Sequence, residues 1–229
     1  MNKIDQNPDY KQMYKFVSDK YLKTNHFGHG PFDETFYSMR VYETAKEIIS
    51  LLKENVHVQQ VLVACILHDI GKVNLKVSKI LSKDGFIENE IASKEWISHP
   101  IYSLPIARKF LQKLGHSQEF IEEILYLVEN HSKRGDRMKE RTLELKIMQD
   151  ADLISDVGIA GFIRTFAYSG KFSSVPLIES IKFIQKADRT LHGHKINLKI
   201  SEKLYKREYD IQQRLAREMY TKIDSDLLN

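Results

Sequence analysis

Cysteine is almost missing from this chain, because Cys65 is the only one among 229 residues. A disulfide within the chain is therefore excluded, and a reducing compartment, the cytoplasm, is the location we expect. No run of apolar residues approaches the roughly 18 that a helix needs to cross a bilayer, so we expect no membrane partner. The first residues, MNKIDQNPDY, are polar and lack the apolar segment of a secretory signal.

A strong excess of one charge is also missing. The 35 lysines and arginines nearly balance the 31 acidic residues, which leaves a formal net charge of +4. That charge is too small and too evenly spread to indicate nucleic-acid binding, but it suits a small anionic substrate. Hydrophobic residues make up 42% of the chain and charged residues 29%, as in an ordinary globular protein. A chain of this length can bury a core without disulfides.

Proline and glycine are few, with 5 and 10 copies, and most of them fall between segments of helical periodicity. No segment alternates as a strand would, so the predicted fold is all-α. We expect helices near residues 10–21, 33–53, 58–70, 74–84, from 88 onward, 100–114, 117–130, from 142 onward, 157–168, 176–191 and 201–228. Ser117 and Thr142 are the predicted N-caps of two of them.

We expect one domain over residues 1–229, with a core at about 33–170 and a C-terminal helical appendage at about 171–229. The last predicted helix is strongly charged. It is a candidate for a homodimer contact or a lid, although a solvated helix face explains the same pattern.

The segment VLVACILHDIGK carries the first chemical signal. Val61, Ala64, Cys65 and His68 follow the spacing of one helix face, so His68 is expected on the buried side, with Asp69 directly after it. A buried carboxylate is costly unless a partner neutralises it, and a divalent metal satisfies both side chains at once. An isolated His-Asp pair, however, is more typical of a helix end with an aspartate on its surface.

Three further helices place ionisable side chains in line with apolar residues. These are Asp152, in line with Leu145 and Met148; His131, in line with Ile124 and Leu127; and His99, in line with Ile106 and Phe110. Each one alone could be a core polar residue with a satisfied hydrogen bond. Together with the His-Asp pair they predict a metal site in the interior of a helical bundle.

The motifs HDIGK, NHS and KIMQDAD, in this order, resemble the HD-domain superfamily of metal-dependent phosphohydrolases. The run ELKIMQDADLISDVGIAGFIRTFAYSG is similar to a bacterial subfamily in which some members cleave nucleoside triphosphates. The resemblance covers about residues 37–170 and implies an all-α HD-domain bundle. It also implies hydrolysis of a nucleotide or another small phosphate ester, by a water that a divalent ion activates. The candidate ions are Mn, Zn, Ni, Co, Mg and Fe, bound as one ion or two.

Position by position, the resemblance assigns roles to individual residues. The metal ligands would be His68, Asp69 and Asp152, with Asp150 as the neighbour of Asp152; His131 matches the histidine of the HS motif, and Arg164 matches the arginine before Thr-Phe. Asp69 would also accept the proton of the attacking water. Lys72 and His131 join it as catalytic candidates.

The chain departs from the family where its first histidine ligand is expected, because Tyr37 stands there. Three explanations are open. His29 or His26, in the preceding loop, replaces the missing ligand; or Tyr37, Asp33 or Glu34 supplies an oxygen; or the metal site has decayed and the protein is an inert ligand-binding relative. Tyr37 shares a helix face with Val41 and therefore points inward in each case.

A second metal is the other open question. The string SHPIYSLPIARKFL followed by NHS resembles dinuclear HD enzymes, in which His99 and His131 would hold a second ion. One dinuclear branch, similar to myo-inositol oxygenase, is an oxygenase. A non-heme iron oxygenase is therefore the alternative enzyme class.

Several basic residues are candidates for binding the phosphate. Lys72 could neutralise a phosphate oxygen or could extend along the surface. Arg134, in a short basic stretch after His131, could steer the anion or belong to a solvated loop. Arg164 is either a substrate clamp or a structural ion-pair partner. Tyr37 and Asp150 complete the set of substrate-binding candidates.

Overall fold

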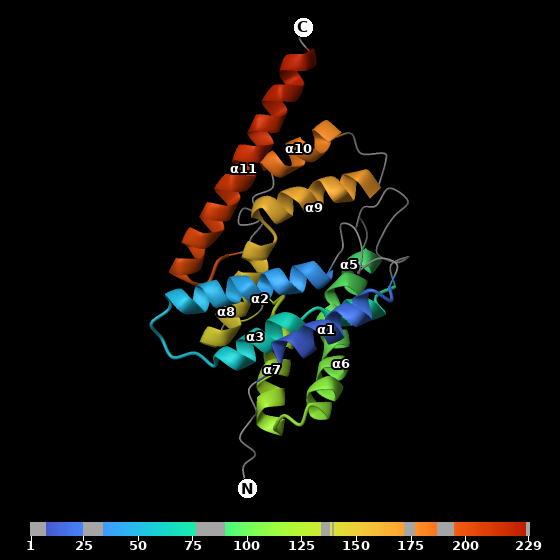
Figure 1. Ribbon diagram of the computed structural model, residues 1–229, viewed down its shortest axis with the longest axis vertical. Helices are drawn as coiled ribbons and strands as arrows, with labels where there is room; N and C mark the ends of the chain where they lie inside the picture. The colour runs from blue at the N-terminus through green and yellow to red at the C-terminus, as the bar shows by residue number, and fades with distance from the viewer. Residues whose placement is uncertain are drawn as a thin grey trace.

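The computed structural model describes residues 8–24, 34–76, 90–133, 138, 140–171, 177–186 and 195–227. Every regular element within these ranges is a helix, which confirms the predicted all-α class (Figure 1). The elements are α1 (Tyr10–Tyr21), α2 (Glu34–Leu51), α3 (Val58–Leu67), the 3-10 helix η2 (Ile70–Asn74), α5 (Glu90–Ile97), α6 (His99–Lys113), α7 (Gln118–Asn130), α8 (Leu143–Ser155), α9 (Gly158–Lys171), α10 (Leu177–Lys186) and α11 (Lys199–Leu227).

Local sequence explains several helix ends. The hydroxyls of Ser117 and Thr142 accept hydrogen bonds from backbone amides three residues later, which confirms both predicted N-caps. After α6 the chain turns at Gly115, whose φ of 81° is a conformation that glycine adopts without strain. One boundary differs from expectation, because α3 ends at Leu67 and leaves His68 and Asp69 in the junction before η2. The helix expected at 74–84 lies mostly outside the described residues.

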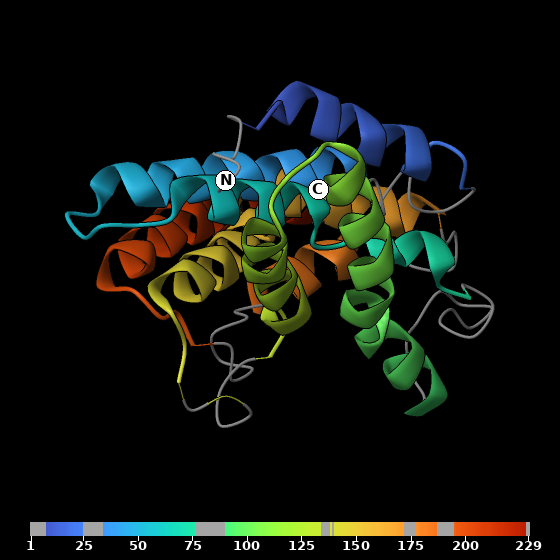
Figure 2. The same ribbon diagram turned by 90° about the horizontal axis from the view of Figure 1, so that it is seen from below.

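Helix α3 is the centre of the main core. Its residues Val61–Leu67 are all buried, and it is apolar around its whole circumference, as a helix surrounded by others must be. It packs against α1, α2, α7 and α8, while α6 packs on η2 and α7. Figure 2 shows α1 on the outside of this bundle, with α6 and α7 side by side. The junction after α3 is therefore enclosed by helices from distant parts of the chain.

The last three helices form a second layer. Helix α11 packs along α9 and α10, and it also contacts α8 (Figure 1). The apolar cluster between these helices is small, with Ile181, Ile184 and Ala216 as its buried members. None of the described helices is both long and apolar enough to cross a membrane. The domain limits and the homodimer stay predictions.

Candidate metal centre

His68 and Asp69 lie at the junction between α3 and η2, and both side chains are buried. The Nδ1 atom of His68 is 2.8 Å from the carbonyl oxygen of Cys65. A carbonyl can only accept a hydrogen bond, so Nδ1 carries the proton. In the neutral ring, Nε2 therefore keeps its lone pair, and it lies 3.1 Å from Oδ2 of Asp69.

The same arrangement recurs at two other histidines. His99 begins α6 and His131 follows α7, and each directs Nδ1 to the carbonyl oxygen three residues earlier, at 2.5 and 2.7 Å. Three imidazoles from three parts of the chain are thus oriented by the same kind of hydrogen bond, from Nδ1 to the carbonyl oxygen three residues earlier. Such hydrogen bonds to Nδ1 orient histidines that bind metals through Nε2.

The Asp69 carboxylate lies between these rings. Its Oδ2 faces His68 and also the ammonium of Lys72, at 2.6 Å. Its Oδ1 faces Nε2 of His99 at 3.0 Å and Nε2 of His131 at 3.5 Å. Oδ1 of Asp69 and Nε2 of His68 are both buried and make no hydrogen bond of normal geometry. Buried atoms of this kind call for a further partner.

The electrostatics of the cluster favour a bound cation. Burial by itself lowers the pKa of His68, but the carboxylates of Asp69 and Asp152 raise it to about 10. Burial opposes ionisation of Asp69, yet the charges of His68 and Lys72 hold its pKa well below the ordinary value. His131 has a lowered pKa, chiefly because it is buried. The proton on His68 thus compensates a negative site that a metal ion would neutralise as well.

The donor set fits a divalent metal. One ligand atom each from His68, Asp69 and His131 lies within 4.8 Å of the others, and all three residues are buried. Imidazole nitrogens with a carboxylate suit Zn, Mn, Fe, Co and Ni.

Asp152 and Tyr37 border this cluster. Asp152 is near the end of α8, and its Oδ1 is 3.7 Å from Nε2 of His68. The hydroxyl of Tyr37 donates to the same Oδ1 at 2.8 Å and to the Asp152 carbonyl at 2.9 Å. Burial and the nearby Asp152 charge raise the pKa of Tyr37 well above its ordinary value. Tyr37 is therefore a hydrogen-bond donor to Asp152 and holds its proton, which disfavours the phenolate ligand considered above.

Lys72 is buried, and the expectation that it extends along the surface is wrong. Its ammonium is 3.0 Å from Oε1 of Glu34, in addition to the contact with Asp69, and it lies 4.9 Å from the centre of the Trp96 ring. Burial lowers the pKa of Lys72, but the two carboxylates outweigh burial and raise it. Lys72 is thus committed to two protein carboxylates. Glu34, which sequence reasoning considered only as an oxygen ligand, is the residue that holds it.

A family model of the HD domain matches residues 36–156, which include the His-Asp pair, His99, His131 and Asp152. The chain belongs to the HD-domain family. No curated protein matches it.

Solved structures share the fold of this HD-domain protein. A predicted HD superfamily hydrolase from an uncultured Thermotogales bacterium is 18% identical, with 94% of this chain and 93% of that chain covered and a TM-score of 0.61. Bacillus subtilis YpgQ in complex with ADP is 18% identical, with 94% and 98% covered and a TM-score of 0.61. An HD-superfamily hydrolase from Bacillus thuringiensis is 19% identical, with 94% and 96% covered and a TM-score of 0.60. At these identities the likeness shows the fold.

Gly71, the glycine of HDIGK, allows η2 to pack closely against α6 in this HD-domain protein. A Cβ on Gly71 would lie 2.3 Å from the carbonyl oxygen of His99, so only glycine lets η2 approach α6 this closely. The Ser103 hydroxyl accepts from the Gly71 amide at 2.8 Å and lies 2.7 and 3.0 Å from the carbonyl oxygens of His68 and His99. Ser103 therefore ties the two histidine segments together, and sequence reasoning missed it because one serine in a helix gives no signal.

Two predicted substrate-binding residues make structural contacts. Arg164 forms an ion pair with Asp156 at 2.8 Å, and its guanidinium lies 4.8 Å from the centre of the Tyr37 ring. Asp150 faces away from the site: its oxygens accept hydrogen bonds from the backbone amides of Asn197 and Leu198, at 2.8 and 2.9 Å. Asp150 therefore fixes the segment that leads into α11, and a role for it in substrate binding stays a prediction.

Some predicted residues lie outside the described part of the chain. They are His29, His26, Asp33 and Arg134. The proposal that His29 replaces the missing ligand therefore stays a prediction.

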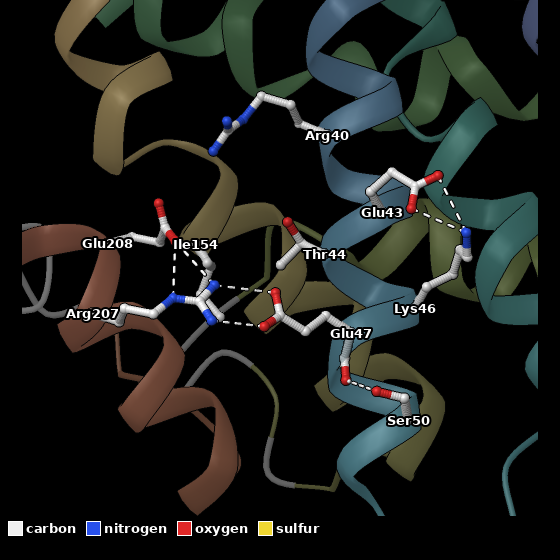
Figure 3. Close-up of a pocket in the computed structure, with 9 residues that line it drawn as sticks. All are labelled: Arg40, Glu43, Thr44, Lys46, Glu47, Ser50, Ile154, Arg207 and Glu208. Atoms are coloured by element: carbon white, nitrogen blue, oxygen red, sulfur yellow. Dashed lines mark hydrogen bonds and ion pairs between the residues drawn. The ribbon is translucent and has the colours of Figure 1, made fainter. Parts of the chain in front are cut away.

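A cavity of about 560 Å³ lies elsewhere, between α2 and α11 (Figure 3). It is lined by Arg40, Glu43, Thr44, Lys46, Glu47, Ser50, Ile154, Arg207 and Glu208. Its charges pair with one another, because Arg207 contacts Glu47 at 2.8 Å and Lys46 contacts Glu43 at 3.0 Å. None of the predicted site residues lines it, so the histidine cluster is the better candidate site.

Proposed function

We propose that this HD-domain protein is a metal-dependent phosphohydrolase that acts on a nucleotide or a similar small phosphate ester. One observation carries the proposal: three buried imidazoles, each fixed through Nδ1, direct Nε2 at the two oxygens of Asp69. This arrangement presents nitrogen and oxygen donors to a cation in a buried place. A divalent ion held there would supply a water activated near neutral pH and would polarise a phosphoryl oxygen.

The protein residues divide the remaining tasks. Asp69 has a depressed pKa, which makes it a strong ligand and a poor proton acceptor. Asp69 is therefore assigned the role of ligand, and His131, whose Nε2 faces Oδ1 of Asp69 at 3.5 Å, is a second candidate ligand beside it. Tyr37 and Lys72 hold the two carboxylates of Asp152 and Asp69 in place.

An anionic substrate agrees with the charges that flank the cluster. The side chains of Arg164 and Lys133 are 32% and 41% exposed, and Lys133 lies two residues after His131. The complex of YpgQ with ADP makes nucleoside phosphates the first class to test.

The test is release of phosphate or pyrophosphate from a nucleotide panel with added Mn²⁺, Co²⁺ or Ni²⁺. We expect turnover that requires the metal, loss of turnover in Asp69→Ala, and normal turnover in His57→Ala, an exposed histidine at the opposite end of α3 from the His-Asp pair. Hydrolysis that persists in Asp69→Ala, or in the presence of excess chelator, would reject the proposal. Two irons per chain with oxygen uptake would instead indicate the oxygenase class.

A further inference from the structure

Arg40 on α2 is the exception among the charged residues of the cavity in Figure 3, because it has no ion-pair partner there. Its Nη2 donates to the carbonyl oxygen of Val157 at 3.4 Å, and its buried Nε makes no hydrogen bond. Among the residues that the structure describes, no carboxylate forms an ion pair with its guanidinium. A guanidinium carries five N–H donors, so most of those on Arg40 have no acceptor from the described part of the protein.

The other charged residues that line this cavity are paired with one another. Nζ of Lys46 is 3.0 Å from Oε2 of Glu43. Arg207 contacts Glu47 at 2.8 Å and Glu208 at 3.0 Å. All three carboxylates of the lining are thus committed to other cations, and none of them neutralises the remaining guanidinium.

The charge balance around Arg40 differs from that around its neighbour Arg164. Burial lowers the pKa of Arg40, and the more distant charges of Glu208 and Asp156 do not offset burial. Burial acts in the same direction on Arg164, but the Asp156 carboxylate at 2.8 Å and other negative charges raise its pKa overall. The surroundings of Arg40 therefore supply too little negative charge, and a bound anion would stabilise its guanidinium.

The cavity has room for such an anion. Its volume of about 560 Å³ lies within the range of small-molecule sites, roughly 300–1,000 Å³. Figure 3 shows the Arg40 side chain extending from α2 toward the turn between α8 and α9, apart from the ion pairs of the other cations. The Thr44 hydroxyl faces Ser155 at 3.2 Å, and the Ser50 hydroxyl donates to a backbone carbonyl. Recognition therefore depends on Arg40, whose planar guanidinium matches two oxygens of a phosphate group.

We propose that this cavity is a second ligand site, in which Arg40 binds the phosphate group of a small molecule. The residues that could hold the metal do not line the cavity, so the inference is independent of the proposed hydrolysis. The phosphate would lie beside the turn between α8 and α9, where Arg40 contacts Val157. It would supply the negative charge that the described carboxylates do not provide.

The experiment is isothermal titration calorimetry of the full chain with inorganic phosphate at constant ionic strength. Arg40→Gln and Lys46→Gln are a matched pair, because each removes one positive charge from the same cavity, whereas Lys46 is exposed and already paired. We expect a phosphate-binding event in the wild type that weakens at least about tenfold in Arg40→Gln and stays within about threefold in Lys46→Gln. Phosphate bound at the metal centre would be common to all three proteins, so the difference between them reports the cavity.

A second probe identifies the source of the phosphate group. Phenylphosphonate carries a similar charged group on an organic body and resists hydrolysis. If it binds more tightly than phosphate and is again weakened by Arg40→Gln, the ligand is a phosphate carried by a larger molecule. If it binds equally or more weakly than phosphate, with the same dependence on Arg40, the ligand is free phosphate.

Three results would overturn the inference. They are equal phosphate affinity in the wild type and Arg40→Gln, equal weakening in Arg40→Gln and Lys46→Gln, which would reflect net charge alone, and no binding of either probe to the wild type. Circular dichroism checks that each variant folds. If Arg40→Gln does not fold, Arg40→Lys replaces it, since it keeps the charge and loses the planar fork, and it should bind phosphate more weakly than the wild type.

Discussion

The metal centre and the C-terminal helices are stabilised by different interactions. Around α3, charged side chains such as Glu34, Asp69 and Lys72 are buried inside the large main core. Between α9, α10 and α11, the buried cluster has three small or medium apolar side chains, and Phe183 on α10 is 63% exposed. The first region depends on charge pairing in a dry interior, and the second on a few apolar contacts.

This contrast determines how much a single substitution should lower the free energy of unfolding in each region. Removal of one partner from a buried ion pair leaves an uncompensated charge, which typically costs about 3–5 kcal/mol. Truncation in a small apolar cluster removes transfer energy and leaves a cavity that the surroundings can partly fill. Four predictions test this ranking.

The largest effect is expected for Lys72→Met, which keeps the volume and removes the ammonium. Glu34 and Asp69 would then face each other without a cation, so the free energy of unfolding of the metal-free protein should fall by about 3–5 kcal/mol. Urea unfolding measures the change. Lys76→Met, at an exposed position just after η2, is the control and should change stability by less than about 0.5 kcal/mol.

A second substitution sharpens this result. Glu34→Gln combined with Lys72→Met removes one of the two stranded carboxylates, so the double variant should be more stable than Lys72→Met alone. If the losses of stability in the two single variants simply add in the double variant, Glu34 and Lys72 are not energetically coupled. That result would contradict the buried ion pair between them.

The pH dependence of the metal-free protein should show the same charge pairing. The pKa of His68 is about 10 in the folded protein and near 6.5 when unfolded, so the folded state binds this proton more tightly. Its contribution to stability is complete below pH 6.5 and is lost as the pH rises through about 10. Urea unfolding from pH 6 to 10 should therefore show falling stability, by a few kcal/mol, and His68→Gln should flatten the curve. A wild-type curve that rises over this range would contradict the assignment.

The sequence predicts the inward-facing histidines because helical periodicity is a local property. His68, His131 and Asp152 each follow apolar residues at spacings of three, four or seven, and the structure brings these side chains together. The N-caps at Ser117 and Thr142 were equally predictable, since each depends on an amide three residues away.

Contacts between distant helices could not be predicted in this way. Glu34 meets Lys72 because the start of α2 lies against η2, and no spacing within either helix encodes that. Asp150 has the same residue type and neighbourhood as Asp152, but its partners are 47 and 48 residues away at the start of α11. A step of two residues along α8 was enough to direct the two carboxylates to different partners.

In the C-terminal helices, Ile184→Ala should have an intermediate effect. Ile184 is fully buried in a cluster with only two other buried members, so we expect a loss of about 2–3 kcal/mol, at the lower end for such truncations. Ile163→Ala, at a 59% exposed position on α9, is the control and should lie within about 0.5 kcal/mol of wild type. Mn²⁺ affinity should be unchanged in both variants. A change in affinity would mean that the two regions are energetically coupled.

The smallest effect is expected at the ion pair between Arg207 on α11 and Glu47 on α2, at the rim of the cavity in Figure 3. The hydrogen bond from Arg207 lowers the pKa of Glu47, but the two side chains are 49% and 41% exposed. Water and salt screen such a pair, so a double-mutant cycle of Arg207→Ala and Glu47→Ala should give a coupling below about 1 kcal/mol. The coupling should shrink further in 1 M salt, where the Debye length is about 3 Å. A larger coupling that resists salt would show that this contact helps to hold α11 against the HD core, and the contrast between the two regions would then be narrower than their packing indicates.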